Sequence, residues 1–337
     1  MNTPKVYLKQ LETLWFQVTG THCNLQCAHC FISCGPKSNA HDILGLDMIR
    51  RYLNEALTLG VKEFYFTGGE PFLHFDLLCK AVEIADALKI PSTFVETNCF
   101  WALDDTTTKE KLRLLKKKGL RGIMISVNPF YLEYVPFERT ERAIRIGLEV
   151  FGRNTMVYQL EYYRRFLQMG IKEKVPFEEY LKMETREDLL RNVEFFVMGR
   201  APYRLRDVLK EYCDQYPASQ LFSQECMTPF LRGWHNHFDN YGNYIPGFCG
   251  GISFGDCRDL DRLLREGIET EQYPVLGFLM DDNIKGLFEF AKESGYKELC
   301  EGYFSKCHPC TDIRRYLALC GDFKELSPRE FYRHLEK

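Results

Sequence analysis

The sequence lacks the features that mark membrane proteins, secreted proteins and nucleic-acid-binding proteins. No apolar run approaches the about 18 uninterrupted residues of a membrane span. Residues 1–20 contain neither the apolar stretch nor the small-residue cleavage site of a signal peptide. The net charge is only −3 over 337 residues, so no attraction to nucleic acid or anionic lipid is expected. We therefore expect a cytoplasmic protein that binds neither nucleic acid nor a membrane.

Internal repeats and low-complexity tracts are also missing, and the composition is that of a folded globular protein. Hydrophobic residues make up 45% of the chain and charged residues 27%, which is enough apolar material for a sizeable core. The length suits one large domain and one smaller domain.

Strand-length apolar runs alternate with helix-like segments over the first part of the chain. The runs are rich in Val, Ile, Phe and Tyr and lie at residues 14–19, 63–67, 93–97, 122–127, 156–160 and 193–198. Segments with helical spacing of apolar residues separate most of them, at residues 47–59, 75–88, 107–118 and 138–151. This alternation predicts an α/β fold with a parallel sheet, either open or closed into a partial barrel.

Three further segments complete the predicted organisation. Residues 161–191 carry many aromatic and charged side chains, which indicates an elaboration over the active site or an extra helical layer. Residues 202–225 are predicted to form a connecting helix between a first domain, residues 1–201, and a second domain, residues 226–337. The second domain is rich in glycine, turns and cysteine, and a turn at residues 240–243 predicts a hairpin within it.

Cysteine is abundant, with 14 residues. In a long chain without a secretion signal, closely spaced cysteines indicate metal or cluster ligation rather than disulfides. Cys23, Cys27 and Cys30 follow the first predicted strand on one short loop. Iron–sulfur clusters usually take four protein ligands, so three thiolates would leave one iron open for chemistry. A zinc site or unrelated buried thiols are the alternatives.

The segment CNLQCAHC resembles the CxxxCxΦC signature of the radical S-adenosylmethionine (SAM) superfamily, with His29 at the aromatic position. Four further segments resemble companion motifs of that superfamily, in the same order along the chain. They are Gly68-Gly69-Glu70-Pro71 for GGEP, Thr97-Asn98 for TN(G) with Cys99 in place of glycine, Ser126-Val127-Asn128 for SxD with Asn in place of Asp, and Val197-Met198-Gly199-Arg200-Ala201 for the GRA segment. The resemblance covers roughly residues 14–201 and implies a partial (β/α)6 parallel barrel.

The resemblance also implies a set of cofactor ligands. Cys23, Cys27 and Cys30 would ligate three irons of a [4Fe-4S] cluster, and the fourth iron would chelate the amino and carboxylate groups of SAM. The GGEP segment would receive the amino group, the loop around His29 would meet the adenine, and the polar strand ends would face the ribose or the carboxylate. The candidate SAM contacts are His29, Gly68, Gly69, Glu70, Pro71, Asn98, Ser126 and Asn128.

The chemistry implied by this resemblance starts with an electron from a reductant such as flavodoxin or ferredoxin. SAM would be cleaved to methionine and a 5′-deoxyadenosyl radical, which would abstract a hydrogen atom from a peptide or small-molecule substrate. The implied activity is that of an oxidoreductase or maturase that oxidises, cross-links or epimerises its substrate. A non-catalytic iron–sulfur electron carrier or scaffold and a zinc-stabilised binding module are the alternatives.

A second group of cysteines lies in the predicted C-terminal domain. Cys226, Cys249, Cys307 and Cys310 resemble the ligands of a twitch form of the SPASM-type extension, which implies an auxiliary [4Fe-4S] cluster; zinc on the same thiolates is the alternative. Cys257 has no place in that order. It is interpreted as a buried core residue, as a thiol that returns a hydrogen atom to a substrate radical, or as a cluster ligand in place of Cys226 or Cys249.

Overall fold

The computed structural model describes residues 5–8, 11–37, 44–185, 197–223, 226 and 230–336. Its centre is a seven-stranded sheet in the order β6-β5-β4-β3-β2-β7-β8. Strands β2 to β6 run parallel to their neighbours, which confirms the predicted α/β fold. The strands are β2 (Thr13–Gln17), β3 (Glu63–Thr67), β4 (Ser92–Thr97), β5 (Gly122–Ser126), β6 (Thr155–Tyr158), β7 (Asn236–Phe238) and β8 (Tyr244–Ile245).

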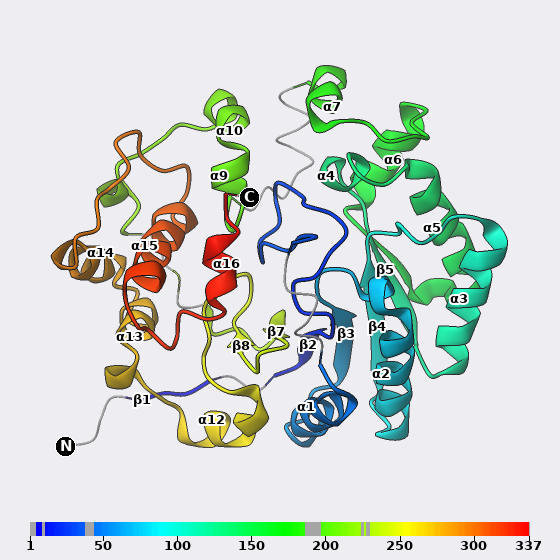
Figure 1. The fold of residues 1–337 in the computed structure, drawn as a ribbon, viewed down its shortest axis with the longest axis horizontal. Coiled ribbons are helices and arrows are strands. Elements are labelled where there is room, and N and C mark those ends of the chain that lie inside the picture. The colour runs from blue at the N-terminus through cyan, green and yellow to red at the C-terminus, as the bar shows by residue number, and fades with distance from the viewer. Residues whose placement is uncertain are drawn as a thin grey trace.

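Helices cover one face of this sheet. Strand side chains alternate between the two faces, so every second residue faces the helices. Apolar residues such as Phe16, Phe66 and Ile123 point to the covered face and are fully buried in one core with the helices. The alternate residues, among them Trp15 and Glu96, line a cavity on the other face. The covering helices are α1 (Leu46–Thr58), α2 (Phe75–Ala87), α3 (Asp105–Lys117) and α5 (Phe137–Phe151) (Figure 1).

The predicted core strands and helices are confirmed, with shifts of one or two residues at most ends. The predicted sixth strand at 193–198 falls mainly outside the described residues, and Val197 and Met198 have no regular structure. Within the predicted elaboration at 161–191, the described part forms α6 (Leu160–Gln168) and α7 (Phe177–Met183).

The prediction of one connecting helix at 202–225 is wrong. The chain there forms two short helices, α9 (Ala201–Arg204) and α10 (Arg206–Tyr212), and later one 3-10 turn, Ala218–Gln220. Pro217 interrupts the segment, since proline lacks the amide that a helix interior needs.

The C-terminal part forms the predicted hairpin and then joins the main sheet. Strands β7 and β8 are antiparallel, and Gly242 in their turn has φ +95°, a conformation that glycine adopts without strain. Strand β7 also pairs in parallel with β2, so His237 lies opposite Trp15. The hairpin therefore extends the core sheet instead of forming a separate layer.

The remaining helices complete the C-terminal side. They lie on the side of the molecule opposite to α3 and α5, with the loop that follows β2 between the two groups (Figure 1). They are α12 (Leu260–Glu266), α13 (Pro274–Met280), α14 (Ile284–Glu293), α15 (Cys307–Cys320) and α16 (Arg329–Arg333). Two further elements lie outside this group: the short helix α4 (Pro129–Leu132) precedes α5, and β1 (Lys5–Val6) pairs with β9 (Ile268–Glu269). In the described ranges, none of the helices combines the length and apolar character that a bilayer crossing requires.

Candidate active site

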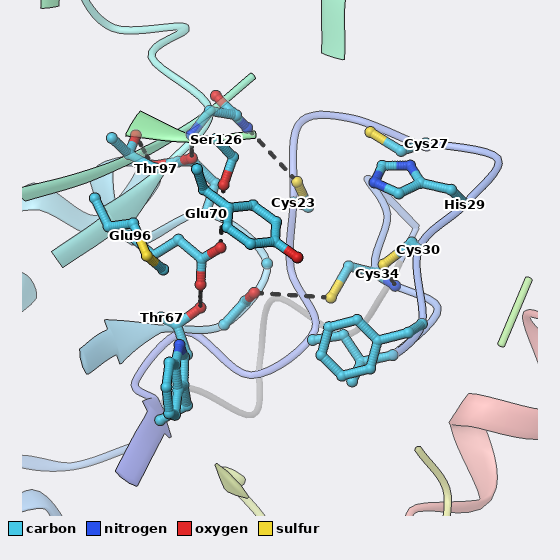
Figure 2. A pocket seen from close by; sticks show the side chains of 18 of the residues that line it. Cys23, Cys27, His29, Cys30, Cys34, Thr67, Glu70, Glu96, Thr97 and Ser126 are labelled. Carbon is cyan, nitrogen blue, oxygen red and sulfur yellow. Dashed lines mark hydrogen bonds between the residues drawn. The ribbon is translucent and has the colours of Figure 1, made fainter. Parts of the chain in front are cut away.

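A cavity of about 570 Å³ lies on the sheet face that the helices leave open. This volume is within the range of small-molecule sites, roughly 300–1,000 Å³. In Figure 2 the cysteine loop lies on one side of the cavity and the polar ends of the strands lie on the other. All of the candidate SAM contacts except Pro71 line this cavity, together with the three cysteines of the first motif.

The cysteine loop begins directly after β2 and closes on itself. The Cys23 amide donates to the Gly35 carbonyl at 3.3 Å, and the Gly35 amide donates to the Thr21 carbonyl at 3.1 Å. The loop therefore enters and leaves at one point, with Cys23, Cys27 and Cys30 turned into the cavity.

Arg200 fixes this loop from the other side. Arg200 is 1% exposed, and its guanidinium donates to the carbonyls of Cys27 at 3.0 Å, Cys34 at 2.7 Å and His334 at 3.2 Å. Its amide donates to the Cys30 carbonyl at 3.1 Å. A Cβ on Gly199 would lie 2.5 Å from the Phe31 Cα, so only glycine allows this close approach.

The positive charge of Arg200 acts on the cysteine thiols. Burial raises the pKa of Cys23 and of Cys27, and the nearby guanidinium opposes that rise. Because the thiolate is the form that binds metal, a buried cation at this position favours cluster ligation.

The Gly68-Gly69-Glu70 turn packs directly on the chain that leads into the cysteine loop. The Gly69 amide donates to the Gly20 carbonyl at 2.8 Å, and the Glu70 amide donates to the His22 carbonyl at 3.0 Å. A Cβ on Gly69 would lie 1.9 Å from the His22 carbonyl oxygen, which is a clash that excludes every residue except glycine. The two glycines thus allow β3 to end against the loop.

Glu70 joins the ends of β3 and β4. Its carboxylate accepts hydrogen bonds from the Phe72 amide at 3.1 Å, the Thr97 hydroxyl at 2.9 Å and the Asn98 amide at 2.8 Å. Burial raises the pKa of Glu70 to about 7 despite these bonds. Pro71 starts the short 3-10 helix Pro71–His74 and does not line the cavity.

Glu96 is a second buried carboxylate in the cavity, which motif reasoning missed. It accepts from the Thr67 hydroxyl at 3.2 Å and the Ser126 hydroxyl at 3.1 Å, on the neighbouring strands β3 and β5. Burial raises the pKa of Glu96, and no ion pair with it is present among the described residues. Its signal in the sequence is a charged residue in a strand, directly before Thr97-Asn98.

The two carboxylates provide a test of whether SAM fits the cavity. Buried carboxylates without a cation are unfavourable, and a positively charged ligand would offset that cost. SAM carries a sulfonium and an ammonium group, so the acidic end of the cavity near the three thiols fits it.

Asn128 and His29 form the wall next to Glu96. The Asn128 side-chain oxygen accepts from the amides of Phe130 and Tyr131 and caps α4, while its NH₂ group donates to the Gln159 oxygen at 3.0 Å and lies 3.2 Å from His29 Nε2. Asn, unlike Asp, can accept at the helix start and donate to Gln159 at the same time. His29 stacks on Phe130, with ring centroids 4.4 Å apart, and burial lowers its pKa to about 3.

Asn98 and Cys99 follow the end of β4 in the segment that resembles the TN(G) motif. The Asn98 NH₂ group donates to the Asn24 side-chain oxygen at 3.1 Å and lies 3.9 Å from the Cys23 sulfur. Cys99 occupies the glycine position of the motif with φ +64°, the left-handed conformation that favours glycine. Cys99 therefore takes a glycine-like backbone conformation at this position.

Cys34 is a fourth thiol in the cavity, and the sequence analysis did not select it. Its sulfur lies 3.9 Å from the Gly68 carbonyl and its amide donates to the Cys30 sulfur at 3.3 Å (Figure 2). The hydrogen bond from the Cys34 thiol lowers the pKa of Cys30 below its ordinary value. Its position only four residues beyond Cys30 is the signal that could have found it.

Cys257 lies elsewhere. It is fully buried in the core next to Tyr52 and does not line the cavity. This placement favours the core-packing interpretation over the hydrogen-donor interpretation.

The family model of the radical SAM superfamily matches residues 18–196 of this chain, which is more than half of its length. The chain belongs to the radical SAM superfamily. Curated relatives include the GTP 3′,8-cyclases of Clostridium botulinum strain Hall (26% identity over 254 residues, 68% of this chain and 73% of that protein) and Nautilia profundicola (22% over 306 residues, 85% and 90%). Similar solved structures include anSMEcpe with bound AdoMet (TM-score 0.42, 14% identity, 91% and 95% covered) and BtrN with AdoMet and 2-DOIA (0.41, 13%, 76% and 83%).

The second group of cysteines in this radical SAM protein also comes together. Mutual repulsion among Cys226, Cys249, Cys307 and Cys310 contributes to raising the pKa values of the first three, after burial. In the described ranges, no three His, Cys, Asp or Glu side chains converge on one metal ion.

A second buried arginine lies beside these cysteines. Arg314 is 4% exposed and donates to the carbonyls of Cys310 at 3.2 Å and Gly250 at 2.9 Å. Burial alone would lower the pKa of Arg314, but Tyr332, Cys310 and Cys249 raise it overall. No carboxylate forms an ion pair with it in the described part of the chain.

Replacing Arg200 should disrupt the cysteine loop. In Arg200→Met three carbonyl groups lose their buried donor, so we expect the free energy of unfolding of the apoprotein to fall by about 3 kcal/mol. Iron bound after anaerobic reconstitution should fall with it, because the loop loses its shape. Urea denaturation and iron analysis measure both; exposed Arg153→Met is the control. Wild-type stability and iron content in Arg200→Met would contradict this role.

Glu70 should make the stability of the apoprotein depend on pH. Its pKa is raised from 4.5 to about 7, so the folded state binds more protons than the unfolded chain between these values. The contribution of Glu70 to the free energy of unfolding therefore falls as the pH rises through this range, by on the order of 1–3 kcal/mol.

Urea denaturation at several pH values, compared between wild type and Glu70→Gln, isolates this contribution. The difference between the two proteins should change between about pH 5 and about pH 7.5 and stay constant above that. A pH-independent difference, like that expected for the exposed control Glu110→Gln, would show that Glu70 titrates at its ordinary value.

Proposed function

We propose that this protein is a radical SAM enzyme that cleaves SAM reductively and abstracts a hydrogen atom from a substrate bound in the same cavity. The observation that carries this proposal is the meeting of three motif cysteines, the Gly68-Gly69-Glu70 turn and two buried carboxylates around one cavity. An electron carrier would not need a cavity with an acidic end beside its cluster.

In this proposal, Cys23, Cys27 and Cys30 hold three irons of a [4Fe-4S] cluster. When bound, the cluster and SAM supply the carbon radical that abstracts the hydrogen atom. The chain supplies the geometry: Arg200 holds the loop in shape, and Glu70 and Glu96 place negative charge where the cofactor is positive. Phe130 and the stacked His29 close the side of the cavity and exclude water.

The remaining candidate contacts would act through the strand ends. Ser126 and Asn98 lie at the ends of β5 and β4, next to Glu96 and Cys23, and would face the ribose or the carboxylate of SAM. Asn128 would act mainly by holding His29 and the start of α4 in place.

The C-terminal cysteines would hold an auxiliary [4Fe-4S] cluster. Cys226, Cys249 and the pair Cys307 and Cys310 of α15 come from three segments of the chain, and Arg314 places a buried cation beside them. A cluster held by four thiolates is anionic, which fits a buried arginine that has no carboxylate partner in the described part of the chain.

The substrate class in this proposal is a peptide or a small molecule that is oxidised, cross-linked or epimerised, with flavodoxin or ferredoxin as the source of electrons. The relatives named GTP 3′,8-cyclase favour GTP as a second candidate. The charge of the cavity argues against GTP, because Arg232 is the only Lys or Arg among the described residues that line it. A triphosphate is normally bound by several cationic groups or a metal ion.

Anaerobically reconstituted protein, reduced with dithionite, should convert SAM to 5′-deoxyadenosine. The combined change Cys23→Ala, Cys27→Ala and Cys30→Ala should abolish this product, because each thiolate holds one iron. Chromatography with mass spectrometry measures the product. The control carries Cys300→Ala and Cys320→Ala, two exposed cysteines, and should cleave SAM as the wild type does.

Two results would contradict the assignment. Full SAM cleavage by the triple variant would show that these cysteines do not hold the reacting cluster. Intact iron without any cleavage by the wild type would favour the electron carrier. Adding GTP to the same assay tests the second candidate, which predicts GTP-dependent consumption of SAM.

The combined change Cys249→Ala, Cys307→Ala and Cys310→Ala should remove the auxiliary cluster. We expect about four irons per chain to be lost, while the iron held by the first loop remains. Metal analysis by mass spectrometry after anaerobic purification measures iron and zinc together. One zinc per chain in the wild type, lost in this variant, would replace the auxiliary cluster by a zinc site.

A further inference from the structure

Strands β2 and β7 form one end of the cavity, and β4 and β5 form the other. Strand β7 pairs with β2 so that His237 lies opposite Trp15. His235 lies two residues earlier on the same side of the chain, and both histidines line the cavity. The candidate SAM contacts come mainly from β3, β4 and β5, so this end is separate from them.

His237 has unused hydrogen-bonding groups in a buried position. It is 2% exposed, and neither ring nitrogen has a partner. Buried polar groups in proteins are normally hydrogen-bonded, so an unpaired ring on a cavity wall indicates a ligand. Burial keeps the ring neutral by lowering its pKa, so it offers one N–H donor and one acceptor.

Arg232 lines the cavity beside the two histidines. Its guanidinium lies 4.4 Å from the Trp234 ring centroid and 4.7 Å from that of Phe248, and its Nε is buried without a partner. No carboxylate forms an ion pair with it within the described ranges. The nearby Cys249 raises the pKa of Arg232 against the effect of burial. A guanidinium that is held by aromatic rings and has no carboxylate partner is suited to bind a carboxylate.

His235 is held in place by strain and packing. Its φ of +57° is unusual for a residue with a side chain, and its ring lies 3.9 Å from the centroid of Phe248 and 4.4 Å from that of Trp15. Strained backbone at a non-glycine residue is found where a side chain must take a fixed direction. Here that direction is toward the cavity beside His237.

We propose that Arg232, His235 and His237 form a subsite that binds a carboxylate group of the substrate. The proposal rests on the proposed function, because it assigns the far end of the same cavity to the substrate. Trp15, Trp234 and Phe248 surround the subsite, so the part of the substrate next to the carboxylate is apolar or aromatic.

The charge balance selects a carboxylate over a phosphate. One arginine and two neutral histidines offset a single negative charge, whereas a phosphate monoester carries −1.5 to −2. Glu70 and Glu96 in the same cavity would repel the excess charge. A neutral amide of the same shape would leave Arg232 without an anion.

Calorimetry on the reconstituted holoenzyme with bound SAM tests this subsite, with 3-phenylpropionate as the probe. The acid should bind at least tenfold more tightly than 3-phenylpropionamide, because charge-assisted hydrogen bonds are the strong ones. Arg232→Gln should weaken binding of the acid at least tenfold. His237→Phe should weaken it several-fold, and His237→Gln should restore part of the loss through its side-chain amide. Exposed Arg153→Gln is the control.

Three outcomes would overturn the proposal: no binding of the acid, equal binding of acid and amide, or tighter binding of phenyl phosphate than of the acid. Wild-type affinity in both Arg232→Gln and His237→Phe would also overturn it. SAM cleavage by the same wild-type preparation separates the two proposals. A preparation that cleaves SAM but does not prefer the acid contradicts the subsite alone, whereas one that binds the acid without cleaving SAM contradicts the proposed function.

Discussion

The buried guanidinium of Arg200 holds together the parts of the chain on which the active site depends. It donates to the carbonyls of Cys27 and Cys34 in the cysteine loop and of His334, about 300 residues further along the chain. A buried arginine is stable only if its donors are satisfied, so the cysteine loop and the C-terminal end are fixed relative to each other. The same charge favours the thiolate form of the cysteines that the loop carries. One side chain therefore sets both the shape and the electrostatics of the loop.

The cavity that results has charges of opposite sign at its two ends. Glu70 and Glu96 lie at the ends of β3 and β4, and Arg232 lies beside β7. In a buried environment this separation orients ligands, because a cation and an anion are each stabilised at one end only. The proposed cofactor and the proposed substrate group have the matching charges, which would place them at opposite ends.

The sequence predicted the elements with strong local signals and missed those that depend on tertiary contacts. Strand–helix alternation located β2 to β6, and the spaced motif located three cysteines that line the cavity, because both signals are local in the chain. The attachment of β7 to the free edge of β2 was not predictable, since a three-residue strand carries no period and its partner is more than 200 residues away. Cys34 and Glu96 were missed because each lies beside a motif but outside its pattern.

Mössbauer spectroscopy tests the central claim most directly, which is that the loop cysteines hold a cluster with one iron open to SAM. The variant Cys249→Ala, Cys307→Ala and Cys310→Ala, reconstituted with ⁵⁷Fe, would contain the loop cluster alone. The account predicts that adding SAM changes the signal of one iron in four and leaves the other three unchanged. A spectrum that SAM does not alter, or one that changes at all four irons equally, would contradict it.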